Sequence, residues 1–283
     1  MHFNVGIVLY NSSVEKLSKV FKEFNKSNVH LILVDNKSDN INDIKKAINK
    51  YQNITLIENA SNKGIAKALN QLIAKTEEED VQFLLTLDQD SFIKFDEVNK
   101  MLDYFKLDNV AMICPEVKDL NKDVNKFIKR PYKQVPRCIT SGSIMNLQLC
   151  KKVGNFDEKM FIDYVDFDYC KKITLNGYKI LKIKNCILIH EIGKRTIRHF
   201  LWKKVYPTNH TSNRVYYQVR NMHYYCLKYK NDMTIKEKIY EFIRIVWKYV
   251  SIVLYEDAKK EKIIHANKGF KDAYLMIKKD KEG

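Results

Sequence analysis

Apolar runs and amphipathic segments alternate along the first ninety residues. Four short runs, at 5–10, 30–36, 54–59 and 81–88, are rich in Val, Ile and Leu, as in strands buried on both faces. Between them, segments that begin at Val14, Ile41 and Ile65 carry apolar residues at helical spacing. Strand and helix therefore alternate, and this order predicts a parallel sheet with right-handed crossovers.

Polar residues follow each predicted strand at the end where open parallel sheets bind ligands. They are Asn11, Asp35, Asn36, Asn59, Asp88 and Asp90. Lys63 and Gly64 precede the third predicted helix, whose N-terminus is a natural anion site. Any one of these residues alone could instead serve a turn or a helix cap. Together they indicate a ligand site at this edge of the sheet.

The stretch LDQDS places Asp88 and Asp90 two residues apart at the end of a predicted strand. In extended geometry both carboxylates would point the same way, and their repulsion would need a cation between or beside them. Mg²⁺ and Mn²⁺ prefer carboxylate oxygens together with substrate phosphates. A D-x-D pair also occurs by chance in loops, so its position at a strand end is what favours a metal site.

A second acidic group lies within FIDYVDFDYCKK, where aromatic and aliphatic residues separate Asp163, Asp166 and Asp168. Partly apolar surroundings can raise the pKa of a carboxylate enough for it to act as a general base. The alternative is the first turn of a helix, where acids are favoured. Further on, His190 ends a strand-like run, where a lone histidine is more often structural than a ligand.

The net charge of +16, from 50 Lys and Arg against 34 Asp and Glu, suits nucleic acid, an anionic membrane or phosphorylated substrates as partners. An even spread over a solvated surface is the alternative. The acids gathered at the predicted ligand site argue against a groove that follows nucleic-acid phosphates.

Six cysteines are spread along the chain without a C-x-x-C pair, which argues against a zinc site or a thioredoxin-like motif. We expect reduced core thiols in a cytoplasmic protein. The N-terminus has no basic leader, and no apolar stretch reaches the ~18 residues of a membrane span.

The C-terminal third interleaves Arg and Lys with Tyr, His and Trp. Residues 213–230 have the pattern of an amphipathic packing helix, or alternatively place Arg214 and Arg220 at the mouth of the site, facing a diphosphate. Residues 235–262 predict one long amphipathic helix whose apolar face is interrupted by Arg244 and Lys248. Such a helix suits an anionic membrane surface, the catalytic domain or a second subunit.

These motifs, in this order, resemble the inverting glycosyltransferases of family 2 and, more narrowly, their bacterial rhamnosyltransferase-like branch. The matching stretches are LVDNKSDN, NASNKGIAKALN, LTLDQDS, TSGSIMN, FIDYVDFDYC and HEIG. The resemblance covers about residues 3–230. It implies an α/β fold of the GT-A type, Rossmann-like and mainly parallel with flanking helices. We expect a catalytic domain over 1–200, with a nucleotide-sugar half at about 1–92 and an acceptor half at about 93–200, then a basic, aromatic helical region over 201–283.

The activity implied by the resemblance is inverting, metal-dependent transfer of rhamnose or another hexose from a dTDP- or UDP-linked donor. The acceptor would be a lipid-linked saccharide or oligosaccharide of a bacterial surface polysaccharide such as a capsule. UDP-linked galactose, glucose or N-acetylhexosamine is the alternative donor. Other classes left open are a nucleic-acid binder, a non-catalytic nucleotide-sugar binder and a nucleotidyltransferase, which would usually carry a Gly-rich phosphate loop that VGIVLYNSS lacks. Peripheral membrane association and a homodimer through the C-terminal helices are further expectations.

The resemblance also implies roles for individual residues. Asp35 would contact the nucleoside base and Asp88 the ribose, while Asp90 would bind Mn²⁺ or Mg²⁺ with His190 as a further ligand and Asp88 beside them. The family's base motif, E-D-x-[DE], corresponds to VDFD at 165–168, which makes Asp166 the general base.

Val165 stands where the first acid of that motif is usual, and Asp163 is the fallback base. The remaining expectations group by role. The nucleotide-sugar side takes Tyr10, Asn11, Asn36, Lys63, Gly64 and Gln89, and the acceptor or sugar side takes Ser141, Gly142, Asp163 and Tyr164.

Overall fold

The structure is a computed structural model that describes residues 1–25, 29–119, 128–190, 198–200 and 203–282. The chain forms two compact units. The sheet unit consists of Met1–Phe161 and Val165–Glu191, and the helical unit consists of Ile162–Tyr164 and Ile192–Gly283. The boundary expected between 200 and 201 falls beside residues 201–202, which lie outside the described residues.

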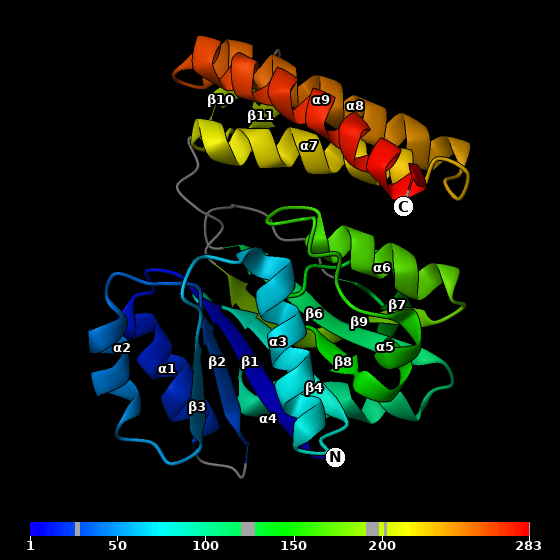
Figure 1. Ribbon diagram of the computed structural model, residues 1–283. Coiled ribbons are helices and arrows are strands. Elements are labelled where there is room, and N and C mark those ends of the chain that lie inside the picture. The colour runs from blue at the N-terminus through cyan, green and yellow to red at the C-terminus, as the bar shows by residue number, and fades with distance from the viewer. Residues whose placement is uncertain (26–28, 120–127, 191–197, 201–202, 283) are drawn as a thin grey trace. The chain divides into compact units, whose positions relative to one another are not determined.

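The sheet unit is built on a nine-stranded sheet, in the order β3-β2-β1-β4-β8-β6-β9-β5, with β7 paired to β9 (Figure 1). Its strands are β1 (Phe3–Leu9), β2 (Leu31–Asp35), β3 (Ile54–Glu58), β4 (Phe83–Asp88), β5 (Ser91–Phe92), β6 (Val110–Asp119), β7 (Tyr132–Gln134), β8 (Ile144–Asn146) and β9 (Lys179–His190).

Strands β3, β2, β1 and β4 are parallel, as the alternation of strand and helix predicts. The other half of the sheet is mixed, since β8 runs antiparallel to β4 and β6 while β6 and β9 are parallel. The prediction of an α/β fold with a central sheet and flanking helices is confirmed, and the parallel part of the sheet is the half formed by β1 to β4.

Helices cover both faces of this sheet (Figure 1). They are α1 (Val14–Phe24), α2 (Ile41–Ile48), α3 (Gly64–Glu78), α4 (Phe95–Leu102), α5 (Leu147–Val153) and α6 (Val165–Leu175), with a short 3₁₀ helix, η1 (Asp103–Lys106). Helices α1, α2 and α4 pack on one face, and α3, α5 and α6 lie on the other.

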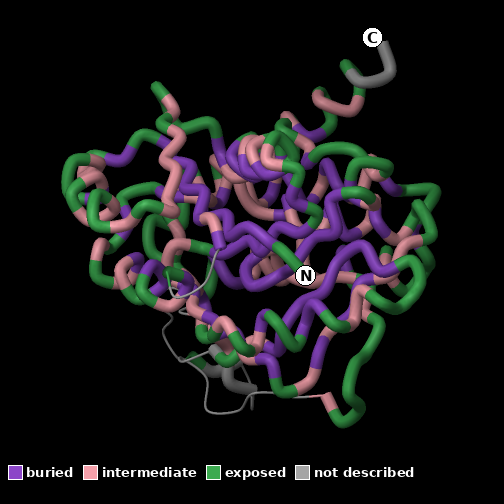
Figure 2. Tube along the Cα trace, turned by 90° about the horizontal axis from the view of Figure 1, so that it is seen from below, coloured by how far each residue is buried: buried purple, intermediate pink, exposed green. Residues whose placement is uncertain are grey.

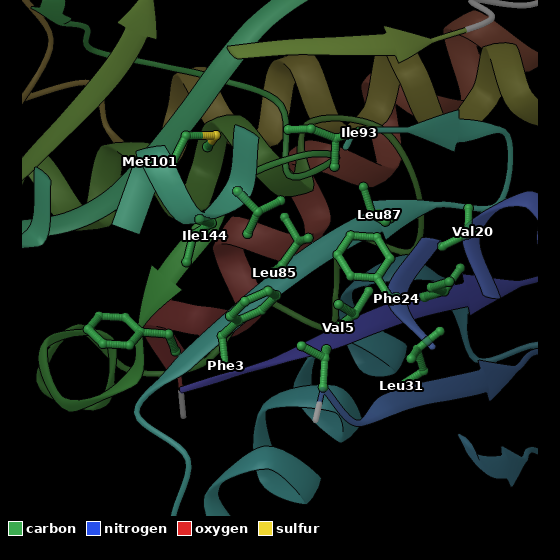
Figure 3. Close-up of a cluster of buried hydrophobic side chains, with 14 of the residues drawn as sticks. Phe3, Val5, Val20, Phe24, Leu31, Leu85, Leu87, Ile93, Met101 and Ile144 are labelled. Carbon is green, nitrogen blue, oxygen red and sulfur yellow. The ribbon is translucent and has the colours of Figure 1, made fainter. Parts of the chain in front are cut away.

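The core follows from the alternation of side chains along each strand. Phe3 and Val5 of β1 and Leu85 of β4 point toward α1 and α4, where they meet Phe24 and Met101 (Figure 3). Figure 2 shows buried residues gathered along the strands. Burying this apolar surface is the main stabilising term for the unit.

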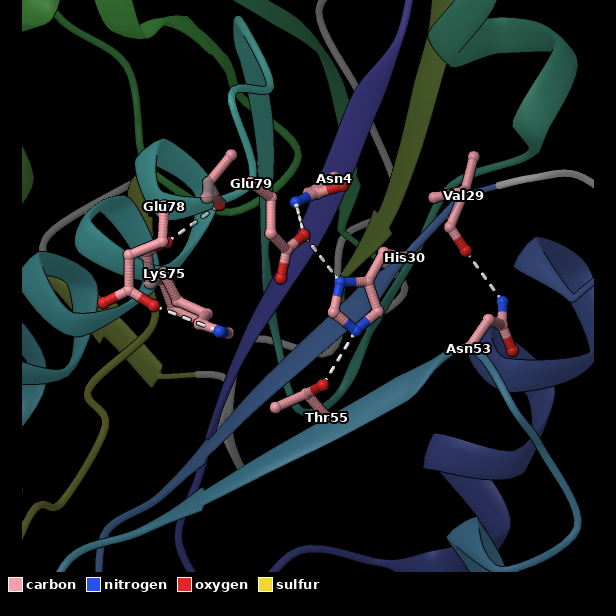
Figure 4. A network of polar contacts seen from close by, with 10 residues as sticks. Asn4, Val29, His30, Asn53, Thr55, Lys75, Glu78 and Glu79 are labelled. Carbon is pink, nitrogen blue, oxygen red and sulfur yellow. Dashed lines mark hydrogen bonds and ion pairs between the residues drawn. The ribbon is translucent and has the colours of Figure 1, made fainter.

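A polar network ties the first three strands to the end of α3 (Figure 4). The Glu79 Oε2 atom accepts a hydrogen bond from Asn4 Nδ2 at 2.8 Å and lies 2.7 Å from His30 Nδ1. The other ring nitrogen of His30 lies 2.9 Å from Thr55 Oγ1. Glu79 follows α3, and the three other residues begin or precede the strands, so the network lies away from the carboxyl ends.

The helical unit holds α7 (Ser212–Lys228), α8 (Ile235–Tyr255) and α9 (Lys259–Glu282), together with a hairpin of β10 (Arg198–Phe200) and β11 (Lys203–Val205). Helices α7 and α9 pack closely (Figure 1). Gly269 permits this approach, because a Cβ atom there would lie 2.5 Å from the carbonyl oxygen of Tyr216.

The prediction of one helix over 235–262 is wrong. The chain leaves the helix at Glu256, which is extended, and Ala258 has a φ of 51° before α9 begins. The buried carboxylate of Glu256 accepts hydrogen bonds from Lys248 Nζ at 3.1 Å and Lys262 Nζ at 3.0 Å. Two lysines on separate helices thus converge on one acid, which a continuous helix would not allow.

None of the described helices has both the length and the apolar content needed to cross a bilayer. All six cysteines lie among the described residues, and no disulfide joins them. Four of them are buried: Cys114, Cys150, Cys170 and Cys186.

Candidate functional site

The parallel register brings the polar ends of four strands to one rim. Leu9 lies opposite Asp35, and Asp35 lies opposite Glu58. On the other side of β1, Val8 lies opposite Asp88. The residues that follow β1, β2, β3 and β4 are therefore neighbours, although as many as 79 positions separate them along the chain.

Asp35 is buried at the end of β2. One of its carboxylate oxygens accepts a hydrogen bond from the Ser38 amide at 2.9 Å, whereas the other, Oδ1, is buried without a hydrogen-bond partner among the described residues. A buried acceptor left without a donor is costly, so it marks a position where a ligand donor would be favourable. Asn11, with a φ of 50°, holds the neighbouring turn by binding Ser38 and Asp39.

Asn36 is occupied by bonds within the protein. Its Oδ1 atom accepts from Asn59 Nδ2 at 3.0 Å and from the Lys63 amide at 3.3 Å, and its Nδ2 atom donates to the Gly64 carbonyl at 3.2 Å. The side chain of Asn36 therefore shapes the loop before α3, while the Lys63 side chain is exposed.

Gln89 links the turn after β4 to the end of β1. Its Oε1 atom accepts hydrogen bonds from the Tyr10 amide at 2.8 Å and from Ser12 Oγ at 2.7 Å. Tyr10 itself is exposed at the rim. The middle residue of the D-Q-D stretch thus fixes the loop between β1 and α1 beside the two acids.

Asp88, Asp90 and His190 converge on one position, where one potential ligand atom from each residue lies within 4.8 Å of the others. Asp88 ends β4, and a turn at Gln89 and Asp90 brings the second acid back toward the first, instead of the extended geometry considered from sequence. Asp90 Oδ1 lies 3.6 Å from His190 Nδ1. Two carboxylates and an imidazole form a donor set that suits Mn²⁺ or Mg²⁺ in oxygen-rich surroundings.

The histidine reaches this position through the sheet. In the antiparallel pair of β5 and β9, His190 lies directly opposite Ser91. Ser91 Oγ lies 2.6 Å from His190 Nδ1 and accepts a hydrogen bond from Ser141 Oγ at 2.8 Å. Which of Ser91 and His190 donates in this contact depends on the tautomer of the imidazole, and in either case the serine orients the ring beside Asp90.

The TSGS turn fits against the end of β4. The Asp88 amide donates to Ser141 Oγ at 3.0 Å, and the Gly142 amide donates to the Thr86 carbonyl at 2.7 Å. Gly142 has a φ of +77°, and a Cβ atom there would lie 2.9 Å from Leu188 and Pro115. This turn therefore requires glycine and holds Ser141 next to Asp88.

The start of α3 touches the chain just before the second acidic stretch. The Ile65 amide donates to the Phe161 carbonyl at 2.7 Å, and a Cβ atom on Gly64 would lie 2.5 Å from the same oxygen. Asn70 adds a second attachment by exchanging hydrogen bonds with the backbone of Phe156 at 2.9 and 3.1 Å. The NKG loop thus positions the segment that leads into α6.

Helix α6 begins at Val165, which puts Asp166 and Asp168 in its first turn. Asp166 is partly exposed, and its Oδ1 atom accepts a hydrogen bond from the Phe167 amide at 2.9 Å. Asp168 is buried, with Lys172 Nζ 3.7 Å from its Oδ2 atom. Of these two acids, Asp166 is the one that solvent can reach.

Asp163 and Tyr164 belong to the helical unit and both have left-handed backbone conformations, with φ of 65° and 66°. Asn221 Nδ2 holds the backbone by donating to the carbonyls of Ile162 and Asp163, at 2.7 and 3.0 Å. Arg214 binds the Asp163 carboxylate with two nitrogens, at 3.2 and 3.4 Å.

The Tyr164 hydroxyl donates to the buried Glu241 carboxylate at 2.6 Å, and burial raises the pKa of this tyrosine. Arg220, the other proposed diphosphate ligand, donates from Nε to Asn221 and stacks on the rings of Tyr216 and Tyr217. Diphosphate binding by Arg214 and Arg220 stays a prediction.

Two positioning residues were missed from the sequence, Ser91 and Asn70. Each stands at the end of a motif, LTLDQDS and NASNKGIAKALN, and each bonds to a residue far along the chain. Their place within those motifs was the available signal, but their partners depend on the sheet register and on loop packing.

One family model matches more than half of the chain. The model of "Glycosyl transferase family 2" matches residues 4–165. The chain is 27% identical over 282 residues to the dTDP-rhamnosyl transferase RfbF of Shigella flexneri, in an alignment that covers 93% of this chain and 90% of that protein.

Among solved structures, TarS 1–349 of S. aureus in complex with UDP-GlcNAc matches with a TM-score of 0.60 and 18% identity, covering 96% of this chain and 81% of that one. GalNAc-T7 with UDP, GalNAc and Mn²⁺ matches with a TM-score of 0.60 and 15% identity, covering 99% and 57%. At such low identity these likenesses show the fold alone. The expected GT-A fold is confirmed.

Proposed function

Since the chain belongs to glycosyl transferase family 2 and is a glycosyltransferase, we propose that it is an inverting, metal-dependent enzyme. It transfers rhamnose, or another hexose, from a nucleoside-diphosphate donor to a saccharide acceptor. The similarity to a dTDP-rhamnosyl transferase supports a dTDP-linked donor. A UDP-linked galactose, glucose or N-acetylhexosamine is the second candidate, which the UDP-GlcNAc complex of a structural neighbour favours.

The observation that carries this proposal is the convergence of Asp88, Asp90 and His190 at the end of the parallel strands. The three residues come from β4, the turn after it and β9, and they are supported by hydrogen bonds through Ser91 and Ser141. Such supporting contacts orient metal ligands and are typical of built metal sites.

In the proposed site, Asp90 and His190 would hold Mn²⁺ or Mg²⁺, with Asp88 beside them. When bound, the ion would neutralise the negative charge on the diphosphate leaving group. Asp35 would bind the nucleoside base through the carboxylate oxygen that has no partner among the described residues, and Asp88 would also bind the ribose. The proposed donor side is completed by the other residues expected there, Tyr10, Asn11, Asn36, Lys63, Gly64 and Gln89.

Asp166 is the proposed general base, with Asp163 as the fallback. Its carboxylate takes the proton from a hydroxyl of the acceptor sugar as that oxygen attacks the anomeric carbon. A new carbon–oxygen bond forms on the face opposite the leaving group, while the bond to the donor diphosphate breaks with its electron pair on the phosphate oxygen. The anomeric configuration is thereby inverted.

Three features of the chain support this assignment of the base. Asp166 is partly exposed, whereas Asp168 is buried beside Lys172 and Asp163 is bound by Arg214. Ser141, Gly142, Asp163 and Tyr164 are the residues proposed for the acceptor side. The bonds described above also give them positioning roles within the protein.

The wider role proposed is synthesis of a bacterial cell-surface polysaccharide, such as a capsule, on a lipid-linked or oligosaccharide acceptor. Work on such an acceptor would take place at the inner face of the membrane. In this proposal residues 1–200 form the catalytic domain, with donor residues in about 1–92 and acceptor residues in about 93–200.

A donor screen tests the proposal. The full chain is incubated with Mn²⁺ or Mg²⁺ and a panel of dTDP- and UDP-linked hexoses, with release of the nucleoside diphosphate as the readout. We expect one donor to be hydrolysed slowly without acceptor and consumed faster with a saccharide acceptor. Nuclear magnetic resonance of the product then gives the anomeric configuration, and a retained configuration would overturn the inverting mechanism.

Two variants make the screen specific for the metal site. Asp90→Ala should lower donor consumption at least a hundredfold and abolish thermal stabilisation by donor with Mn²⁺. Asp43→Ala removes an exposed acid of α2 and should change neither. Full activity of Asp90→Ala, or of wild-type protein in excess chelator, would overturn the metal dependence.

A further inference from the structure

Helix α8 exposes an apolar side, unlike the amphipathic helices of the sheet unit. An amphipathic helix normally turns its apolar face to the core and its charged face to water. In α8 most of the exposed large apolar residues share one outward side, whereas Glu241, Arg244 and Lys248 lie on the inward side, as does the buried Ile252. The sequence had placed Arg244 and Lys248 on the apolar face, and the structure corrects this, because both lie on the inward side.

The outward face of α8 is a continuous apolar stripe. Its exposed members recur at spacings of three and four residues, so they lie on one side of the helix. They are Ile235, Ile239, Phe242, Ile243, Val246, Val253 and Leu254. Phe242 is 65% exposed and Ile243 59% exposed, values usual for charged surface residues rather than for Phe and Ile.

The inward side of α8 is fixed by polar contacts. Glu241 is fully buried, accepts a hydrogen bond from the Tyr164 hydroxyl, and lies 3.6 Å from Arg244 Nη1. Lys248 donates to the buried Glu256. Rotating α8 to bury its apolar stripe would remove these charges from their partners, so the stripe is held outward by the fold.

The charge of the chain is concentrated in the same region. Residues 192–283 contain 21 Lys and Arg against 9 Asp and Glu, whereas residues 1–191 contain 29 against 25. Lys236 and Lys238 are exposed on the first turn of α8, one on each flank of the stripe. Lys259 and Lys260 are exposed where α9 begins.

We propose that the outward face of α8 docks on an anionic lipid surface, with the apolar stripe in the interface and the flanking lysines on lipid head groups. Exposed apolar faces of this length mark interaction sites, and a stripe flanked by lysines is the pattern of a helix that lies in the plane of a membrane surface. Negative head groups complement the basic flanks. The lysine stems extend beside the stripe and carry their ammonium groups to the head-group level.

A second copy of the chain would fit this face less well. Two identical basic units would bring like charges together around the stripe, which opposes association at low salt. The same charges strengthen binding to an anionic bilayer at low salt. Salt dependence therefore separates the two occupants.

The test uses the full chain, without donor or acceptor, in flotation with vesicles of phosphatidylcholine alone or with about 30% phosphatidylglycerol, on the order of the anionic content that gives a membrane its negative surface potential. We expect at least tenfold stronger partitioning to the anionic vesicles at low salt, and a fall as salt is raised. Because no nucleotide sugar is present, failure here would not touch the proposed transferase activity, and failure of the donor screen would not touch vesicle binding.

Variants locate the binding face. The double variant Phe242→Ser with Ile243→Ser should lower partitioning at least tenfold without changing the melting temperature, since both side chains are exposed. The control Leu175→Ser changes an equally apolar, exposed residue of α6 and should bind as the wild type does. Lys236→Glu with Lys238→Glu should weaken binding and reduce its salt dependence.

Three results would overturn the proposal. One is the absence of binding to anionic vesicles at low salt. Another is equal partitioning by the Phe242→Ser and Ile243→Ser variant and by wild type. The third is a wild-type dimer in sedimentation equilibrium that becomes a monomer when Phe242→Ser and Ile243→Ser are introduced, together with no binding to vesicles. That result would assign the outward face of α8 to a second copy of the chain.

Discussion

The two units differ in where their functional and structural charges lie. The sheet unit has a large apolar core and also buries Asp35, Glu116 and Asp168, while the candidate metal ligands stand at its rim, with Asp88 exposed and Asp90 partly exposed. In the helical unit Glu241 and Glu256 are buried against tyrosine, arginine and lysine, while the apolar stripe of α8 lies outside.

This difference predicts which charged residues matter for activity and which matter for stability. A buried charge is tolerated only where oppositely charged or hydrogen-bonding partners surround it. Removing it leaves those partners buried without compensation, which destabilises the fold. A carboxylate at an open rim is accessible to a substrate or a metal, and its removal costs the fold little. Substitutions in the sheet unit's rim should therefore change activity, and substitutions inside the helical unit should change stability.

The largest effect is expected for Asp166→Asn. Loss of a general base lowers kcat by about 10³-fold, within the usual range for such catalysis. Asparagine keeps the size of the side chain and its place in the first turn of α6, so the melting temperature and donor binding should stay near the wild-type values. Steady-state kinetics and calorimetric titration with the donor measure the two effects.

Asp168→Asn is the matched control, because this acid is buried beside Lys172. It should lower the melting temperature more than Asp166→Asn does and reduce kcat far less. An active Asp166→Asn enzyme would remove the assignment of the base, and Asp163→Asn would then be tested in its place.

A second prediction compares the substitution of one apolar residue in each unit. Leu85→Ala opens a cavity in the core of the sheet unit and should lower the free energy of unfolding by about 3 kcal/mol. Phe242→Ala removes a larger side chain from the outward face of α8 and should cost under about 0.5 kcal/mol. Denaturant unfolding followed by circular dichroism gives both values, and a large cost for Phe242→Ala would show that the stripe is covered within the protein.

The sheet unit could be predicted well from sequence because its signals are local. The run from Val5 and the run that ends at Asp88 are apolar enough to be strands wherever they pack, and parallel register then brings their ends together. The pairing of Ser91 with His190 could not be foreseen, because it depends on which distant strand lies beside β5. The spacing of apolar residues along a strand does not indicate which other strand will pair with it.

The helical unit was harder to predict, because one of its helices, α8, breaks the usual rule of polarity. A pattern of apolar and charged positions predicts an amphipathic helix but assumes that the apolar side is inside. The partners that reverse this in α8 are Tyr164, 77 positions before Glu241, and Glu256 in the break after the helix. The break itself went unseen, since Glu256 and Ala258 carry no proline or glycine signal.

A third prediction concerns the interior of the helical unit. Glu241→Ala removes the acceptor of the Tyr164 hydroxyl and the acid beside Arg244, and should lower the free energy of unfolding by about 2–3 kcal/mol. Glu261→Ala, at an exposed position in the first turn of α9, should cost about 0.5 kcal/mol or less. If Glu241→Ala and Glu261→Ala had the same melting temperature, the buried carboxylate of Glu241 would not stabilise the helical unit, and the contrast with the rim of the sheet unit would fail.

The smallest effect expected is a change in the pH dependence of stability at His210. Burial lowers the pKa of this imidazole to about 4, and Arg214 beside it acts in the same direction, while Asp163 opposes the shift. Between the ordinary pKa of histidine, about 6.5, and that value, the unfolded chain binds a proton that the folded chain does not. Stability is therefore lost as the pH falls through this window and regained as it rises.

Because His210 is only partly buried, the loss should be about 1–2 kcal/mol, less than the full shift would give in a dry interior. His210→Gln removes the titration, so the free energy of unfolding of wild type minus that of the variant should fall by this amount from pH 7 to pH 4. His2→Gln, at an exposed position, should leave the difference flat. A difference that stayed constant for His210→Gln as well would mean that the imidazole titrates alike in both states, and that the interior of the helical unit is open to water at this point.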